Sequence, residues 1–446
     1  MRALAGPLLA LFLGACSGGT PRPKNVLLVC VDTLRADQLG AYGQEPSITP
    51  RLDALAAESV VFERAHSAAS WTLPSLGSTF TSQWSSTTGL WTFESKLAES
   101  FTTLPELFAA RGFDTYGIAS HVYFDGQYGL QQGFARFDAE LCHRKGEPGW
   151  REVTSPEVTA RAARWLSDRA DDPDPFLLFV HLFDPHLPYL DHEAADPNDA
   201  HRSEWERYRS EIAFTDGHVG ALLDALAASG HADDTLVVFF SDHGESFLEH
   251  PPINRHSYGL FEEELRVPLF VKVPGLAARR VASFVRSVDL LPTLVELFGL
   301  DDRERELRVG QSLVGALRGE SHVEHPNVAE IRLKEGFHAN ALVSGNEKLI
   351  EDVSSGRYRL YDLAADPRER RDLAPTNPER VEALKSALTA LIAEAATRGA
   401  RFPKDAAVQH TPEELQHLFD LGYGGEDSEK GKQPEGDGKP VGNEGQ

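Results

Sequence analysis

The hydrophobic positions of the chain form short, nearly unbroken runs that alternate with amphipathic stretches. The apolar runs cover residues 25–31, 176–183, 235–241 and 268–273. Helical periodicity marks residues 50–58, 155–169 and 215–228. Unbroken apolar runs are typical of strands that are buried on both faces of a parallel sheet. Their alternation with helices predicts an α/β sandwich, with a large, mainly parallel central sheet flanked by helices.

The pattern changes near residue 320. Short strand-like segments follow at 328–331, 341–344, 348–353 and 357–363. Turn residues join them, so they predict a small antiparallel sheet, which a helix over 378–396 follows. We therefore expect a main domain over residues 24–320 and a C-terminal subdomain with closing helices over 321–423. Residues 424–446 lack apolar periodicity and predict a disordered acidic tail.

The amino terminus, MRALAGPLLALFLGAC, predicts an export signal over residues 1–15. Its apolar run is too short for a transmembrane helix, which needs about 20 residues. The segment that ends at Cys16 resembles a bacterial lipobox, and a plain secretory signal is the alternative. We expect a lipidated linker over 16–23 and an exported protein, anchored through Cys16 to a bacterial membrane on the periplasmic or outer-membrane side.

The composition is that of a globular enzyme, with 41% hydrophobic and 25% charged residues. The net charge of -24 disfavours nucleic acid as a partner, and it implies that an anionic ester is attracted only locally. Besides Cys16, the chain has only Cys30, in an apolar run, and Cys142, in a polar stretch. A buried thiol and a loop thiol fit this placement better than a disulfide.

Polar side chains follow three of the predicted strands. Asp32 ends the first, Asp184 and His186 follow the second, and Asp242 and His243 end the third, after Ser241. Ligands of open parallel sheets gather at the carboxyl ends of the strands. Asp32 alone would fit a helix cap, but together these carboxylates and imidazoles predict a divalent-metal site.

A hydroxyl-rich stretch, SWTLPSLGSTFTS, lies between these strand ends. Thr72, Ser75 and Ser78 are candidate nucleophiles, and a Ser/Thr-rich loop with a helix cap is the alternative. A threonine hydroxyl needs a metal or a base to become a good nucleophile.

Several ordered segments of the chain resemble the sulfatase family of the alkaline phosphatase superfamily. They are NVLLVCVDTLRADQLGAYG, TPRLDALAAESVVFERAHS, WTLPS, HLFDPHLPY, SDHGESFLEH, EEELRVPLFVKVPG, VDLLPTLVELFGL and RLYDLAADPRERRDLA. The resemblance runs from about residue 25 to 425. It implies a large α/β domain, a smaller C-terminal sheet subdomain and one divalent metal ion, usually calcium, with manganese, magnesium or zinc as alternatives.

The resemblance implies that Asp32, Asp242, His243 and Thr72 bind the metal. Thr33 stands where many sulfatases have a second aspartate. The formylglycine motif of true sulfatases falls on residues 72–76, with Thr72 in place of its Cys or Ser and Leu76 in place of its arginine. We therefore expect no formylglycine. Thr72 instead matches the threonine nucleophile of phosphoglycerol transferases and nucleotide phosphodiesterases in the superfamily.

The same resemblance proposes catalytic or substrate-binding histidines. His186 matches a substrate-binding histidine, His181 is a second candidate nearby, and His256 stands near a substrate-binding lysine of many sulfatases. His121 and His250 are weaker candidates. A lysine-tryptophan-histidine segment of the family is replaced around residues 119–121.

Together these features predict an exported, metal-dependent hydrolase of sulfate or phosphate esters, with Thr72 at the nucleophile position. Such an enzyme would be a sulfuric ester hydrolase or a related phosphoric ester hydrolase. A phosphodiesterase or phosphoglycerol-type transferase is the first alternative, favoured by Thr72 and His243. A surface lipoprotein that binds without turnover is the second, suggested by Thr33 and Leu76.

Overall fold

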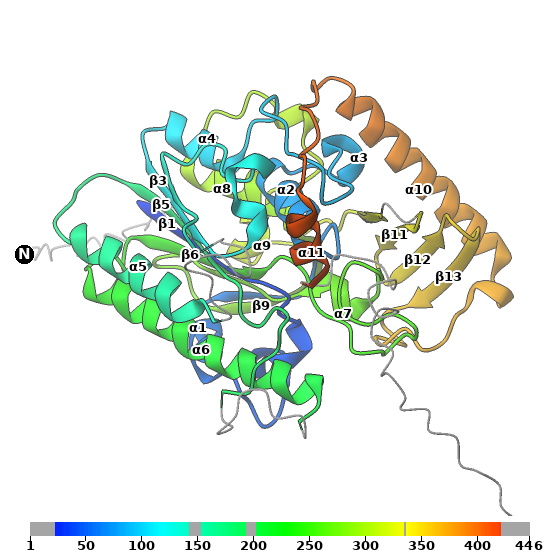
Figure 1. The fold of residues 1–446 in the computed structure, drawn as a ribbon, viewed down its shortest axis with the longest axis horizontal. Helices are drawn as coiled ribbons and strands as arrows, with labels where there is room; N and C mark the ends of the chain where they lie inside the picture. The colour runs from blue at the N-terminus through cyan, green and yellow to red at the C-terminus, as the bar shows by residue number, and fades with distance from the viewer. Residues whose placement is uncertain (1–22, 142–152, 193–201, 334–335, 421–446) are drawn as a thin grey trace, which may run out of the picture.

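The computed structural model describes residues 23–141, 153–192, 202–333 and 336–420 of the 446-residue chain. In this part of the chain, a nine-stranded sheet forms the main body and a four-stranded sheet lies beside it (Figure 1). The predicted signal over 1–15, Cys16, Cys142 and the tail over 424–446 lie outside the described residues. Among the described helices, none is both long and apolar enough to cross a membrane.

The nine-stranded sheet has the order β4-β3-β5-β1-β6-β8-β2-β7, with β9 paired to β2. The strands are β1 (Asn25–Val31), β2 (Val60–His66), β3 (Asp114–Ala119), β4 (Arg136–Asp138), β5 (Phe176–Leu182), β6 (Thr235–Ser241), β7 (Arg266–Val267), β8 (Leu269–Lys272) and β9 (Arg279–Arg286). β4, β3, β5, β1 and β6 run parallel, and β8 is antiparallel to β6. The apolar runs predicted β1, β5, β6 and β8, whereas β2 and β9 escaped prediction because charged side chains interrupt them.

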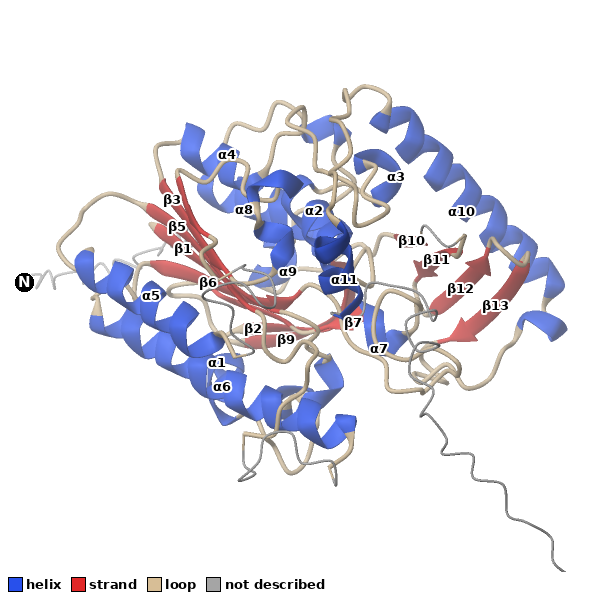
Figure 2. Ribbon diagram, in the orientation of Figure 1, coloured by secondary structure: helices blue, strands red, loops and turns tan. Residues whose placement is uncertain are grey.

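Helices cover both faces of this sheet (Figure 2). They are α1 (Pro50–Ala57), α5 (Ser155–Asp168) and α6 (Glu204–Ala228) on one face, and α2 (Thr72–Thr81), α4 (Leu104–Ala110), α8 (Leu290–Phe298) and α9 (Val314–Arg318) on the other. Side chains of β1 alternate between the two faces, since Val26 packs in the α2 layer and Leu27 in the α6 layer. This burial on both faces explains the unbroken apolar run.

Two predicted elements differ from the structure. α6 begins at Glu204 instead of residue 215, because Ser203 and Glu206 form a capping box that starts the helix eleven residues earlier. The hydroxyl-rich stretch is the buried helix α2, so its interpretation as a loop was wrong. Thr79 and Thr81 donate their hydroxyls to backbone carbonyls four residues earlier, which lets a polar sequence form a buried helix.

The four-stranded sheet is antiparallel in the order β10-β11-β12-β13, as the sequence predicted. Its strands are β10 (Asn327–Arg332), β11 (His338–Ser344), β12 (Glu347–Asp352) and β13 (Arg357–Asp362). One face packs on α10 (Pro378–Gly399), through Leu342 and Leu384 among others. The other face packs on Leu260, Phe261 and Leu265, beside the short helix α7 (Glu262–Leu265). α7 thus joins the small sheet to the main body.

Shorter elements complete the fold. They are the helices α3 (Ser85–Thr88) and α11 (Pro412–Asp420), and 3₁₀ turns at Ala36–Gln38, Gly40–Tyr42, Val122–Phe124, Gly126–Tyr128, Ser287–Asp289, Arg305–Leu307 and Ala374–Thr376. Cys30 is a free, buried thiol in the core of the main body, as predicted.

Candidate active site

Three neighbouring parallel strands bring Asp32, Asp242 and His181 together. β1 lies between β5 and β6, and its register pairs Cys30 with His181 and Val31 with Ser241. The residues that follow β1 and β6 therefore emerge side by side at the carboxyl edge of the sheet. All three side chains are fully buried, and they form a group that could hold a metal, with ligand atoms within 4.8 Å of one another.

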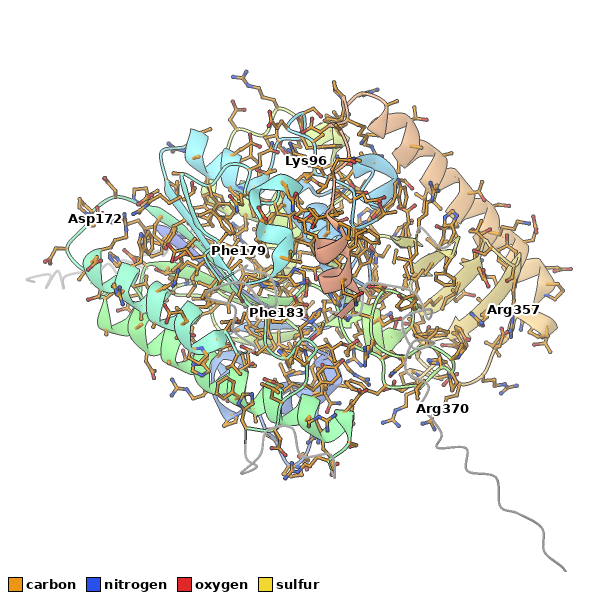
Figure 3. The ribbon with its side chains drawn as sticks, in the orientation of Figure 1. Lys96, Asp172, Phe179, Phe183, Arg357 and Arg370 are labelled. Carbon is orange, nitrogen blue, oxygen red and sulfur yellow. The ribbon has the colours of Figure 1, made fainter. Side chains whose placement is uncertain are left out.

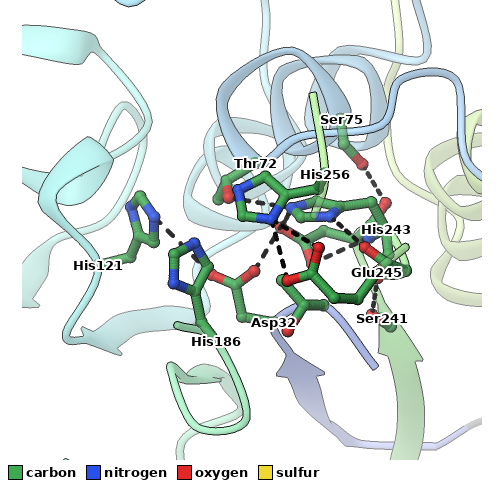
Figure 4. A network of polar contacts seen from close by, with 12 residues as sticks. Asp32, Thr72, Ser75, His121, His186, Ser241, His243, Glu245 and His256 are labelled. Carbon is green, nitrogen blue, oxygen red and sulfur yellow. Dashed lines mark hydrogen bonds and ion pairs between the residues drawn. The ribbon is translucent and has the colours of Figure 1, made fainter. Parts of the chain in front are cut away.

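The four predicted metal ligands also meet here, and Figure 4 labels three of them, Asp32, Thr72 and His243. His243 Nε2 lies 3.3 Å from Thr72 Oγ1, 3.4 Å from Asp32 Oδ1 and 3.6 Å from Asp242 Oδ2. His243 Nδ1 donates to the carbonyl of Gly244 at 2.9 Å, which leaves the lone pair on Nε2. Burial lowers the pKa of His243 well below its usual value, so the imidazole is neutral, the form that binds metals.

Thr72 is placed by the start of α2. The helix begins at this residue, and its Ser75 hydroxyl donates to the backbone carbonyl of Asp242 at 2.6 Å. A second hydroxyl, from Ser67, lies 2.9 Å from that of Ser75. These contacts fasten the first turn of α2 to the end of β6, so Thr72 keeps its position beside His243.

The donor set fits a divalent cation. Both carboxylate oxygens of Asp32, and Oδ2 of Asp242, are buried without a hydrogen-bond partner among the described residues. Burial, and then the neighbouring carboxylates of Asp242 and Glu245, raise the pKa of Asp32 well above its usual value. Donors around zinc or calcium lie about 3.3–3.7 Å apart at ordinary bond lengths and angles, close to the spacings observed here. A cation would satisfy these oxygens and offset their repulsion.

His181 was predicted as a catalytic or substrate-binding residue, and the structure places it against the carboxylate pair. Its Nε2 lies 3.5 Å from Asp32 Oδ2, and neither ring nitrogen has a hydrogen-bond partner among the described residues. Burial lowers the pKa of His181 to about 3. A neutral, buried imidazole in this place suits the metal group better than a contact with substrate.

His256 and His186 lie beside this group, and both rings have one nitrogen anchored. His256 Nδ1 lies 3.2 Å from each carboxylate oxygen of Glu245, whose Oε2 accepts a hydrogen bond from the Tyr189 hydroxyl at 2.7 Å. His186 Nδ1 donates to the carbonyl of Leu187 at 2.8 Å. The ring of His256 is 4.9 Å from that of His243 and 4.8 Å from that of His186. In both neutral rings, Nε2 is therefore the atom that can exchange a proton.

Asp184 lies outside the site, although the sequence grouped it with the metal-site carboxylates. Its Oδ2 accepts hydrogen bonds from the backbone N–H and the hydroxyl of Ser155, at 2.7 and 2.5 Å, at the start of α5. Asp184 therefore caps a helix, which is the alternative that had been considered for Asp32. Ser241 is structural as well, because its hydroxyl donates to the carbonyl of His243 at 2.6 Å.

Sequence reasoning underrated His121 and missed Glu245. His121 follows β3 and is fully buried, with Nε2 3.9 Å from Asp32 Oδ2. Its Nδ1 accepts from the backbone N–H of Tyr123, so Nε2 carries the proton that faces the carboxylate. β3 reads DTYGIA, a mixed sequence that did not stand out as a strand. His250, the other weak candidate, pairs with Glu263 at 2.7 Å, away from the group.

Two departures from the sulfatase pattern have structural counterparts. Leu76 is fully buried in the apolar core, so a packed side chain occupies the position of the family's arginine. Thr33 has a φ of 54°, a conformation that is strained for a β-branched residue, and its buried hydroxyl has no partner among the described residues. Such strain next to Asp32 is typical of a functional site.

Comparison with known proteins assigns the chain to a family. The family model described as Sulfatase matches residues 24–300. An ulvan-active sulfatase of Formosa agariphila is 28% identical over 318 residues, which span 62% of this chain and 62% of that relative. A delta 4,5-hexuronate-2-O-sulfatase of Bacteroides thetaiotaomicron is 25% identical over 435 residues, covering 81% of this chain and 86% of the relative.

Solved structures share the fold. A 2-O GAG sulfatase superposes with a TM-score of 0.70 at 19% identity, covering 88% of this chain and 99% of that one. A phosphonate monoester hydrolase of Agrobacterium radiobacter gives a TM-score of 0.69 at 21% identity, covering 84% and 96%. Because the family model matches well over half of the sequence and the fold agrees, this chain belongs to the sulfatase family of the alkaline phosphatase superfamily.

Proposed function

We propose that this protein is a metal-dependent hydrolase of sulfate or phosphate esters, in which Thr72 attacks the ester. The observation that carries the proposal is the spacing of 3.3–3.6 Å that joins Thr72, His243, Asp32 and Asp242 in a buried group. Asp32, Asp242 and His243 would hold the cation, with calcium the expected ion. A divalent cation in this place lowers the pKa of a neighbouring hydroxyl and neutralises the nonbridging oxygens of an ester.

The chain's own residues supply the remaining chemistry. Thr72 Oγ1 forms a bond to the sulfur or phosphorus, and the bond to the leaving alcohol breaks. The threonine loses a proton and the leaving oxygen gains one, and Nε2 of His256 or His186 is placed to exchange it. Water then hydrolyses the threonine ester. No formylglycine takes part in this scheme, since Thr72 holds its position.

A phosphodiesterase or phosphoglycerol-type transferase is the second candidate. The close contact between the Thr72 hydroxyl and His243 supports it, because a metal-bound threonine beside an aspartate-histidine pair suits attack on phosphorus. The phosphonate monoester hydrolase among the similar folds is consistent with this chemistry.

The test is a paired assay of the purified protein on an aryl sulfate, a phosphate monoester and a phosphodiester, with calcium, manganese or EDTA. Sulfate cleavage that EDTA abolishes would support the sulfatase activity without formylglycine. Preferential phosphodiester cleavage would favour the second candidate. Inactivity on all three esters with both metals would contradict both and would favour the binding lipoprotein.

We also propose that the protein is exported and anchored through lipid on Cys16. The lipobox-like segment supports this proposal. Metabolic labelling with radioactive palmitate in a bacterial host should label the wild type and spare Cys16→Ala. Equal labelling of the two proteins would show that Cys16 does not carry the lipid.

A further inference from the structure

A cavity of about 550 Å³ lies apart from the Thr72 group. It opens between the segment after β1, the start of α6, the α7–β7 segment and the segment after β13. Its lining includes Arg35, Trp205, Arg266, Arg368 and Arg370. Its volume lies within the range of about 300–1,000 Å³ that is usual for small-molecule sites.

The carboxylates of this cavity already have partners. Asp37 and Glu249 both pair with Arg35, Glu262 pairs with Lys348, and Glu263 pairs with His250. Each of these four carboxylates therefore already pairs with a basic side chain of the protein. The acidic lining therefore offers no unpaired carboxylate to a cation.

Three arginines of the lining differ from these carboxylates in their ion pairing. Arg266, Arg368 and Arg370 form no ion pair with any residue that the structure describes. Nε of Arg266 is buried and has no hydrogen-bond partner within the described ranges, while its Nη2 donates to the carbonyl of Glu63 at 3.0 Å. The whole chain has 68 acidic residues against 44 basic ones, whereas the cavity lining has four carboxylates and four arginines. Among the described residues, three of these four guanidinium groups have no ion-pair partner, which leaves them available to an anion.

Two aromatic rings line the same cavity. Trp205 packs against Tyr208 and Phe247, with ring centroids at 6.0 and 5.1 Å, and is thus held firmly at the start of α6. The guanidinium of Arg35 lies over the Trp205 ring, 5.1 Å from its centroid. Tyr42 stacks on Phe270, at 5.8 Å, and lies under the guanidinium of Arg266, at 6.0 Å. Guanidinium groups thus lie against both rings, and a planar guanidinium offers N–H donors that fit an oxyanion in a bidentate manner.

We propose that this cavity binds an acidic sugar. Arg266, Arg368 and Arg370 would hold its sulfate or carboxylate group. The binding site is separate from the Thr72 group, and the proposal does not depend on which ester Thr72 attacks. The backbone of Glu245 lies between the two sites, since Arg35 donates to its carbonyl at 3.0 Å and its side chain holds His256.

The probe is a trisulfated heparin disaccharide, with its unsulfated counterpart for comparison, and binding is measured by calorimetry on full-length protein. We expect Arg368→Ala/Arg370→Ala to weaken binding of the sulfated sugar at least about 10-fold. The matched control is Arg111→Ala/Arg357→Ala, which removes the same charge from exposed arginines outside the cavity; Arg357 and Arg370 lie well apart in Figure 3. The control should bind as the wild type does.

A second measurement locates the binding site. The sulfated sugar should slow amide hydrogen exchange in residues 366–371 of the wild type and not in the Arg368→Ala/Arg370→Ala variant. Equal weakening by both double variants, or unchanged exchange over 366–371, would overturn the proposal. Turnover of a small aryl ester should stay within about twofold in the cavity variant, so failure of this site is distinguishable from failure of the Thr72 chemistry.

Discussion

Glu245 holds the imidazole of His256, with Nδ1 of the ring 3.2 Å from each of its two carboxylate oxygens. Both side chains are fully buried, and the Tyr189 hydroxyl fixes the carboxylate from the other side. A buried acid that orients a histidine and sets its tautomer is a recurring device in hydrolases. Here it holds the His256 ring 4.9 Å from the ring of His243, measured between centroids.

Glu245→Gln should therefore act on the chemical step. The amide keeps a hydrogen-bond acceptor but loses the charge that favours the imidazolium, so we expect kcat to fall about 10- to 100-fold with KM within about twofold. Metal content should stay unchanged. Glu211→Gln is the control, since Glu211 is also a buried glutamate paired with a histidine, His192, but it lies outside the Thr72 group. A rise in KM with unchanged kcat would show that Glu245 supports substrate binding instead.

Thr72 can be tested within its own helix. Thr72→Ala should lower turnover by about 10³-fold or more, because the attacking oxygen is lost, while metal binding persists through Asp32, Asp242 and His243. Thr72→Ser keeps the hydroxyl and should retain measurable turnover. The control is Thr79→Ala on the same helix, which likewise removes a buried hydroxyl and a methyl group, here a hydroxyl that donates to the Ser75 carbonyl. If Thr72→Ala turned over at a near-normal rate, the nucleophile would be elsewhere.

Asp242 and Asp184, which follow two parallel strands of the same sheet, should respond in opposite ways. Asp242→Asn should weaken metal binding by about 100-fold or more, since a charged ligand becomes a neutral amide. Asp184→Asn should keep the metal and lower the melting temperature, because Asp184 caps α5. Calorimetric metal titration and thermal unfolding of both variants check this contrast. Equal metal affinity in wild type and Asp242→Asn would show that Asp242 is not a metal ligand.

The periodicity of the sequence predicted the strands that are buried along their whole length or that lie between clear turns. β1 is apolar throughout because both of its faces are buried, and the antiparallel strands β10 to β13 lie between clear turns. β3 and β9 mix polar and apolar residues, so neither stands out as a strand. The sequence of α2 is rich in hydroxyl residues and resembles a loop, but in the folded helix these hydroxyls donate to backbone carbonyls. Those partners are created by the folded helix and cannot be read from composition.

The candidate site was predictable only in part, for a similar reason. The end of each strand indicated Asp32, Asp242 and His243, because parallel strands bring these ends together. Distinguishing Asp184 from Asp32 required the position of α5, because the backbone N–H of Ser155 at the start of this helix donates to the Asp184 carboxylate. Likewise, His121 belongs to the site only because β3 lies beside β5, a pairing between segments about 60 residues apart.

A buried ion network joins the small sheet to the main body. Lys348, on β12, is fully buried between Glu262, at 3.1 Å, and Glu369, at 2.9 Å. Glu262 also contacts His66 on β2, at 3.1 Å. α7, which carries Glu262, accepts the backbone N–H groups of Gly244 and Glu245 through the carbonyls of Glu264 and Glu263. The network thus connects the subdomain with the segment that bears His243.

Glu262 should make the stability of the protein depend on acid pH. Burial opposes its ionisation, but His66 and Lys348 outweigh this effect and lower the pKa of Glu262 below its usual value of 4.5. A carboxyl whose pKa falls on folding stabilises the protein above its unfolded pKa, and this contribution is lost as the pH falls. Glu262→Gln should therefore cost about 1–3 kcal/mol of unfolding free energy at pH 7, and the difference from wild type should shrink below about pH 4.5. Urea unfolding at pH 7, 5 and 3.5 measures it, with the exposed Glu320→Gln as control. A difference that stayed constant with pH would mean that Glu262 contributes packing and not charge.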